Sequence, residues 1–426
     1  MFKEKLTKET KILLFIILFT VLSGAIRKWV VNSNAVGNII MGVQLFSPFY
    51  FLKTKGGYKP FENKLFTISL FYLVLSAINF RNLTVFHGIL GIIIHINLFY
   101  LLFYYYYNRH LIQFQPIINL ALILCAGELI LGFIQYGLPP KHFLNAYADA
   151  ERGGDVAVVV DSVRVTGTFS YLSGYTAFLI FYSFFTWALI KIQYNARITV
   201  TLIVLGFVAS FMSGSRGTTF TYTLFLLYLI IFEFKEVHYH NIVKSMFMPI
   251  VVIIMLNMVT GKLSVVDQVV KAYDNFMLRR ENGAASGEEQ KRIFWDFEQL
   301  YYFKGNYPYY GVGLGSTYQG ATSLFGVSRY VLAEGYLETE LTRVVVEGGF
   351  ILLILRFSLM ISILIKLSFN NRDKIFLFCF FLFFGGYAFN VYNAIFIFLG
   401  FVIADQAFIN KDKEINFIQY KRGLKF

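Results

Sequence analysis

Long apolar runs constrain this chain more than any other feature of its sequence. Residues 12–26, 88–107 and 117–136 are too long and too apolar to be helices of a soluble core. A helix that crosses the hydrocarbon core of a bilayer needs roughly 20 predominantly apolar residues. The runs therefore predict an all-α, polytopic membrane protein.

The composition supports a membrane setting. Of the 426 residues, 57% are hydrophobic and 15% are charged, whereas a soluble domain carries roughly 25% charged residues. The net charge of +13 does not by itself indicate nucleic acid, because basic residues collect in the cytoplasmic loops of membrane proteins. Cys125 and Cys379 both lie inside apolar runs, so we interpret them as packing residues rather than disulfide partners or zinc ligands.

A hydropathy window of roughly 19 residues predicts about twelve spans. Their approximate ranges are 11–31, 37–52, 65–80, 88–107, 116–137, 168–190, 198–214, 217–234, 244–261, 344–366, 374–389 and 391–409. Most of the short loops on the same side of the membrane as the N-terminus are basic, which places both termini in the cytoplasm. Two sizeable loops, 139–165 and 262–343, are then external.

This topology predicts three parts. The first, 1–165, holds the N-terminal transmembrane helices and the shorter outer loop. The second, 166–410, is a membrane domain that includes the large external loop. The third, 411–426, is a basic cytoplasmic tail.

Four arginines are predicted to share the outer face. They are Arg164, Arg216, Arg292 and Arg343. Arginine at a membrane boundary is costly unless it is paired or hydrated, and its planar fork suits phosphate or carboxylate. Four on one face would suit a pyrophosphate, although each could instead pair with a loop glutamate or a lipid headgroup. Arg216 favours an anion site most, because its short turn at 213–217 contains serine and glycine that leave backbone N–H groups available.

Acidic residues gather at the end of the large loop. Segment 334–347 is predicted to be helical, with Glu334 and Glu338 on one face and Glu340, Arg343 and Glu347 in a second row. One interpretation is a surface ladder of ion pairs that leads into a span. The other is a general base that takes a proton from an attacking sugar hydroxyl.

Together, four motifs resemble the O-antigen polymerase and ligase superfamily, the Wzy-type membrane glycosyltransferases. The motifs are Arg-Val-Thr-Gly-Thr-Phe at 164–169, Ser-Gly-Ser-Arg-Gly at 213–217, Arg292 followed by the glycine turn 310–315, and Glu-Gly-Gly at 347–349. The turn that contains Arg216 is the most specific match. The N-terminal spans are similar to the family in hydropathy alone.

The resemblance implies a GT-C-like helical scaffold and a defined chemistry. A glycan on an undecaprenyl-type pyrophosphate would be transferred to an acceptor hydroxyl at the outer face of the bacterial cytoplasmic membrane. The four arginines would hold the pyrophosphate, and Arg216 would also act catalytically by stabilising the charge that develops on it. No metal, cofactor or nucleic acid is implied. The implied partners are the lipid-linked repeat unit, membrane lipid, a flippase and a chain-length regulator.

One difference from the ligases points to the polymerase branch. Ligases carry a histidine nine residues before the motif's glutamate, and Glu338 occupies that position here. None of the six histidines lies in the large loop. In the polymerase branch the acceptor is the next lipid-linked repeat unit. Glu338 is then the first candidate base and Glu340 the second.

Three other functions remain open. A ligase would attach finished glycan to a lipid or protein, and a structural membrane protein would carry no chemistry. A flippase or exporter should place ionisable residues within its spans. The candidates for that role are Glu128, His95, Arg356 and Asp405.

Overall fold

The computed structural model describes residues 5–78, 84–148, 158–159, 162–233, 265–285, 309–335, 340–384 and 391–423. Its α-helices are α1 Lys8–Ala25, α2 Asn34–Phe46, α3 Lys64–Ala77, α4 Val85–Asn108, α5 Phe114–Gly137, α6 Leu172–Lys191, α7 Ala196–Met212, α8 Arg216–Phe232, α11 Val265–Ala285, α14 Gln319–Phe325, α15 Arg329–Glu334, α16 Glu340–Lys366, α17 Asn371–Phe384 and α18 Val391–Gly423. Strands β1 (Val158–Val159) and β2 (Ser162–Val163) form a short antiparallel hairpin.

Within the described ranges, seven helices are long and apolar enough to cross a membrane. They are Lys8–Val30, Asn34–Lys53, Val85–Leu111, Phe114–Gly137, Leu172–Lys191, Glu340–Lys366 and Asn393–Lys411. Shorter apolar helices are α3, α7 and α8. This confirms an all-α membrane protein. The predicted span at 244–261 lies outside the described residues, and the total of about twelve stays a prediction.

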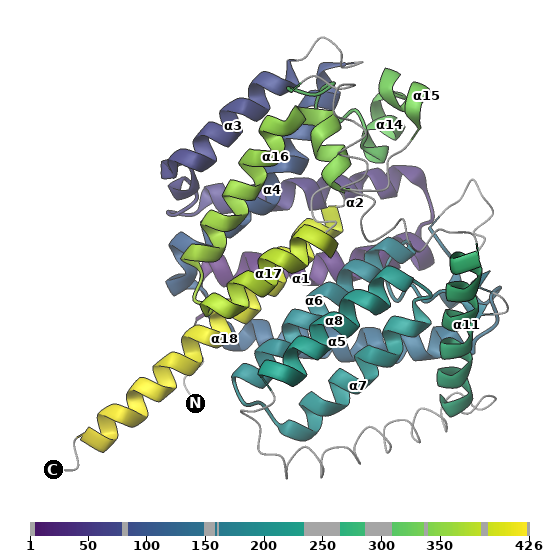
Figure 1. The fold of residues 1–426 in the computed structure, drawn as a ribbon, viewed down its shortest axis with the longest axis vertical. Coiled ribbons are helices and arrows are strands. Elements are labelled where there is room, and N and C mark those ends of the chain that lie inside the picture. Colours follow the sequence, from purple (N-terminus) through teal and green to yellow (C-terminus); the bar gives the residue numbers. More distant parts are fainter. Residues whose placement is uncertain are drawn as a thin grey trace. The chain divides into compact units, whose positions relative to one another are not determined.

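The helices cluster into two compact units, each assembled from distant parts of the chain (Figure 1). Unit 1 contains Met1–Gln44, His110–Asn282 and Leu399–Phe426. Unit 2 contains Leu45–Arg109 and Gly283–Phe398. The two units are defined by contacts between residues. The predicted boundary between residues 165 and 166 divides the chain by expected role instead, so these contacts do not test it and it stays a prediction.

Unit 1 is built around α6, which packs against α7 and α8 (Figure 1). Helix α6 is apolar on all sides, as expected of a helix that is buried on all sides. Phe184 contacts Phe225 of α8 and Phe401 of α18. Lys191, which ends α6, forms a buried ion pair at 2.6 Å with Glu233, directly after α8. The turn between α7 and α8 therefore lies at the opposite end of this bundle, near the start of α6.

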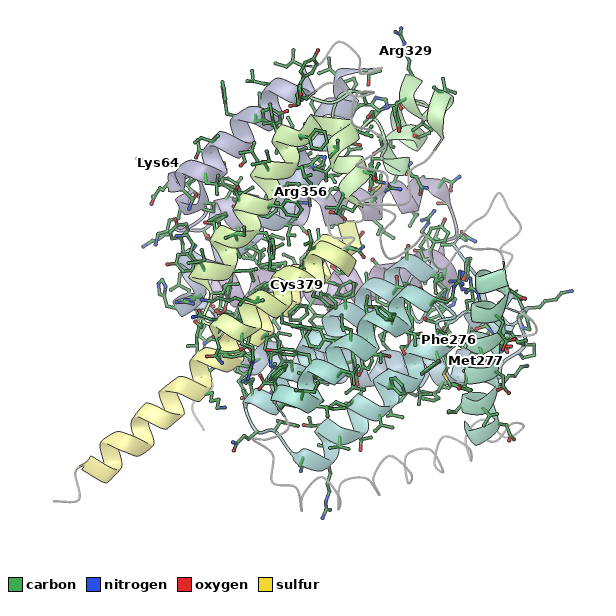
Figure 2. The ribbon with its side chains drawn as sticks, in the orientation of Figure 1. Lys64, Phe276, Met277, Arg329, Arg356 and Cys379 are labelled. Atoms are coloured by element: carbon green, nitrogen blue, oxygen red, sulfur yellow. The ribbon has the colours of Figure 1, made fainter. Side chains whose placement is uncertain are left out.

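Unit 2 is organised around α4, which packs against α3, α14 and α16. The tyrosines that lie along α4 are not all interfacial, because Tyr100, Tyr104 and Tyr105 are fully buried. Of the two cysteines, Cys125 of unit 1 is buried, whereas Cys379 on α17 is exposed (Figure 2). The packing interpretation is confirmed for Cys125 and wrong for Cys379.

The predicted helix over 334–347 is wrong at its start. Helix α15 ends at Glu334, and Gly335 adopts a φ of +76° in the left-handed region, where a helix of L-residues cannot continue. Helix α16 begins at Glu340 and has a break of its own at Gly349, where φ is +69° and ψ is −176°. The prediction treated the glycines as ordinary helical positions, which their backbone angles exclude.

Candidate functional site

Three arginines from separate segments meet at the turn between α7 and α8 in unit 1. Arg164, directly after β2, donates from Nε to the carbonyl of Ser213 at 3.4 Å. Arg279 of α11 donates to the carbonyl of Gly214. Arg216, the first residue of α8, donates to the carbonyl of Arg279 at 3.2 Å. This confirms the short turn predicted around Arg216. Arg164 and Arg279 contact the same turn.

The turn between α7 and α8, which these arginines contact, borders a narrow recess that we call the arginine recess. Its walls come from the end of α5, from β2, from the α7–α8 turn and from α11, and include Tyr136, Ser162, Arg164, Asn275 and Arg279. The free space is no more than one water molecule requires. Figure 2 labels Phe276 and Met277 on α11, and Phe276 belongs to the wall.

The arginine recess has two cationic side chains in its wall. Burial and, second, the charge of Arg279 lower the pKa of Arg164 from its ordinary value. An arginine starts so high that it remains charged at neutral pH. The carbonyls of Ser213 and Gly214 lie at the C-terminal end of α7, where a helix carries about half a negative charge. That half charge offsets only part of the two guanidinium charges in the wall, Arg164 and Arg279, and Arg216 adds a third at the same turn, so the recess suits an anion.

The other predicted site residues have different positions. Arg343 lies in α16 of unit 2 and is half-buried. Glu340 begins the same helix, and its carboxylate forms an ion pair at 3.0 Å with Arg356. Arg292 and Glu338 lie outside the described residues. The structure thus brings together Arg164 and Arg216, the two predicted arginines of unit 1.

Polar side chains from α5 and from the end of the first span pin the motif that follows Arg164. Gly167 donates to Gln135 Oε1 at 2.8 Å, and Gln135 Nε2 donates back to the carbonyl of Gly167 at 2.9 Å. Lys28 Nζ donates to the hydroxyl of Thr166 at 2.8 Å and to the carbonyl of Gly167 at 2.9 Å. The segment is therefore a fixed, buried support for Arg164 rather than a solvated loop.

Glu128 of α5 completes this support, and we call its contact with Thr168 the Glu128 clamp. Its Oε2 accepts from the backbone N–H of Thr168 at 3.1 Å. The hydroxyl of Thr168 lies 2.5 Å from Glu128 Oε1 and 2.6 Å from the carbonyl of Val21. A hydroxyl has one proton to donate, and a carbonyl can only accept. Both short contacts are hydrogen bonds when Glu128 supplies the second proton, so the geometry fits a protonated carboxyl.

A similar arrangement in unit 2, the Glu347 clamp, pins the glycine turn. Glu347 Oε2 accepts from the N–H of Gly315 at 2.8 Å. Its Oε1 accepts from the N–H of Thr317 at 2.9 Å and from the hydroxyl of Thr317 at 2.6 Å. Glu347 is 1% exposed. Its buried carboxylate is thus fully occupied in holding the turn.

His95 of α4 connects the Glu347 clamp to two further charges. Its Nε2 lies 3.0 Å from Glu347 Oε2, and its Nδ1 lies 3.2 Å from an Nη of Arg356. Arginine can only donate, so Nδ1 accepts and Nε2 carries the proton that is donated to Glu347. Arg356, labelled on α16 in Figure 2, also donates to Glu340 at 3.0 Å. All the donors around Glu347 therefore favour an ionised carboxylate.

The glycine turn also closes the break in α16. Val312 and Gly313 donate from their backbone N–H groups to the carbonyls of Val346 and Glu347, at 2.7 and 3.1 Å. Tyr72 donates from its hydroxyl to the carbonyl of Gly348 at 2.6 Å. The turn that the sequence predicts at 311–315 is present, and it lies against α4 and α16.

Sequence reasoning missed Arg279, the His95–Glu347 pair and the pinning role of Glu128. The ionisable residues inside the spans gave a signal, since such residues are rare unless they have partners. That signal did not reveal which partners they have. Compared with known proteins, the chain matches no protein-family model, no curated protein and no solved structure.

Proposed function

We propose that this chain is a polysaccharide polymerase of the O-antigen polymerase and ligase superfamily, with about twelve spans and a GT-C-like scaffold. Its substrate is a glycan linked to undecaprenyl pyrophosphate, and its acceptor is the next lipid-linked repeat unit. The reaction takes place at the outer face of the bacterial cytoplasmic membrane, in O-antigen, capsule or exopolysaccharide synthesis. The supporting observation is the convergence of Arg164, Arg216 and Arg279 on one turn.

The chemistry asks for positive charge where the leaving group departs. The acceptor oxygen attacks the anomeric carbon of the donor glycan, and the bond from that carbon to the pyrophosphate oxygen breaks. The electron pair leaves with the pyrophosphate, whose growing charge the arginine recess stabilises. Arg292 and Arg343 stay proposed as substrate-binding residues.

A base takes the proton of the attacking hydroxyl. Glu338 keeps first place for this role and Glu340 second. Glu340 already pairs with Arg356, which stabilises its charged form and makes it a weaker proton acceptor. In a polymerase with Glu338 as base, Glu338→Gln should slow the chemical step more than it weakens substrate binding.

The test is a glycan gel from a strain that lacks the gene, complemented with Arg216→Ala or Arg197→Ala. Arg197 is exposed at the other end of α7 and provides the matched control. Surface glycan should stop at a single repeat unit in the null strain and with Arg216→Ala, while Arg197→Ala restores full-length polymer. Full-length polymer with a stably inserted Arg216→Ala protein would contradict the proposal.

The second candidate is a flippase or exporter of lipid-linked oligosaccharide. The buried ionisable residues Lys28, Glu128, His95 and Arg356 favour it, since transporters use such groups within their spans. Here each of them bonds to a neighbouring segment, which is a structural role. In the same gel, single units trapped on the cytoplasmic side indicate a flippase, and finished polymer left on the carrier indicates a ligase.

A further inference from the structure

Buried polar atoms without partners lie at and near the arginine recess. Ser162, a wall residue, is 5% exposed and close to Tyr136, yet its hydroxyl has no partner at hydrogen-bond geometry among the described residues. Gln268 of α11 is 2% exposed, and neither its amide oxygen nor its nitrogen has a partner there. Buried polar groups are nearly always hydrogen-bonded, so these atoms call for a ligand or for water.

The inward face of α11 carries three polar side chains. Gln268, Asn275 and Arg279 are spaced seven and four residues apart, which places them on one face. Asn275 donates to the hydroxyl of Tyr136 at 3.4 Å, and Arg279 bonds to Gly214. By contrast, the side chains of Tyr273 and Leu278 are exposed. The same inward face also carries Ala272 and Phe276, so α11 buries its polar groups beside apolar ones.

The two kinds of polar group at the recess ask for two kinds of ligand chemistry. Guanidinium groups bind an anion, and a phosphate fits their fork. A serine hydroxyl and an asparagine amide each both donate and accept, as sugar hydroxyls do. A sugar phosphate combines the two requirements in one molecule.

We propose that the arginine recess binds the sugar residue attached directly to the pyrophosphate, with Ser162 and Asn275 contacting the hydroxyl groups of that sugar. This inference rests on the proposed function and specifies which part of the substrate the recess recognises. The free space holds at most about one water molecule, so α11 must move outward to admit a sugar ring. The contacts that hold α11 in place include those from Arg279 to Gly214, from Asn275 to Tyr136 and from Phe276 to Phe211.

The test compares a bare carrier with the same carrier bearing one sugar. The probes are farnesyl pyrophosphate and farnesyl pyrophosphates that carry glucose, galactose, N-acetylglucosamine or N-acetylgalactosamine. Binding to the purified full-length protein in detergent gives a Kd for each. The variants are Ser162→Ala and Asn275→Ala, and Asp274→Ala on the exposed side of α11 is the matched control.

At least one sugar-bearing probe should bind the wild type about tenfold more tightly than the bare carrier, as one or two good hydrogen bonds provide. Ser162→Ala and Asn275→Ala should remove most of this difference and leave the Kd of the bare carrier unchanged. Asp274→Ala should change neither value. Competition by a free sugar 1-phosphate, lost in Ser162→Ala, would support the sugar subsite and show that the recess does not require the lipid.

Two results would overturn the subsite. One is that no sugar-bearing probe exceeds the bare carrier, which leaves the unpartnered atoms to water. The other is that both variants weaken bare and sugar-bearing carriers equally. In either case binding of the bare carrier would leave the pyrophosphate site standing. If the bare carrier also fails to bind the wild-type protein, the proposed function itself fails.

Discussion

The Glu128 clamp of unit 1 and the Glu347 clamp of unit 2 make the same local contact with different protonation. In each, a helix carboxyl group bonds to both the N–H and the hydroxyl of one threonine, Thr168 or Thr317. In each, a glycine with positive φ lies shortly before that threonine: Gly167 directly precedes Thr168, and Gly315 is two residues before Thr317. The geometry at Glu128 fits a neutral acid, whereas the donors at Glu347 favour a carboxylate.

This difference follows from the neighbours. Glu347 accepts hydrogen bonds from His95 and from the glycine turn, and Arg356 lies one step further, so its negative charge is stabilised within unit 2. The ammonium group of Lys28 is directed to Thr166 and the carbonyl of Gly167, and no ion pair joins it to Glu128 among the described residues. A buried carboxyl without a direct cationic partner lowers its desolvation cost by keeping its proton.

The largest effect should come from Glu347→Ala. The change leaves two backbone N–H groups, a hydroxyl and His95 without their acceptor, and it removes one of the two carboxylates in the network of His95 and Arg356. Breaking a buried charged network in this way costs about 3–5 kcal/mol. We expect the detergent-solubilised protein to lose most of its folded fraction, measured by size exclusion and thermal unfolding. A melting temperature within a few degrees of the wild type would mean that Glu347 does not hold the turn.

The matched pair Glu347→Gln and Glu128→Gln should separate the two clamps most clearly. At position 347 an amide nitrogen would replace an acceptor that faces only donors, so the loss should be about 2–3 kcal/mol. At position 128 the amide nitrogen can donate to the Thr168 hydroxyl in place of the carboxyl proton, so the change should stay within about 0.5 kcal/mol. Denaturation curves of both proteins provide the comparison. Equal losses would refute the difference in protonation.

A smaller effect is expected for Gly167→Ala, beside the Glu128 clamp. Gly167 has a φ of +56°, and a Cβ there would overlap Glu128 Oε2. The backbone strain alone costs about 1–2 kcal/mol. Gly127→Ala, one residue before Glu128, is the control, because a Cβ there meets open space and should be neutral or slightly stabilising. If both variants have the same melting temperature, the left-handed conformation at Gly167 is not required.

The sequence predicted what is local and missed what is distant. The apolar runs and the short turn at Arg216 depend on neighbouring residues, and both are present. The contact between His95 and Glu347 joins positions 252 residues apart, and no pattern in either segment reveals it. The helix predicted through Gly335 fails for another reason, since periodicity describes side chains and carries no information on backbone angles. Arg279 was not among the four arginines that the sequence singled out.

The break at Gly349 has a consequence for how α16 enters the membrane during synthesis. Backbone groups that no helix satisfies are strongly disfavoured in hydrocarbon. The carbonyls of Val346, Glu347 and Gly348 accept from Val312, Gly313 and Tyr72, residues that the ribosome makes earlier. The backbone carbonyls at the break in α16 are therefore satisfied only once the glycine turn and α3 are in place beside it.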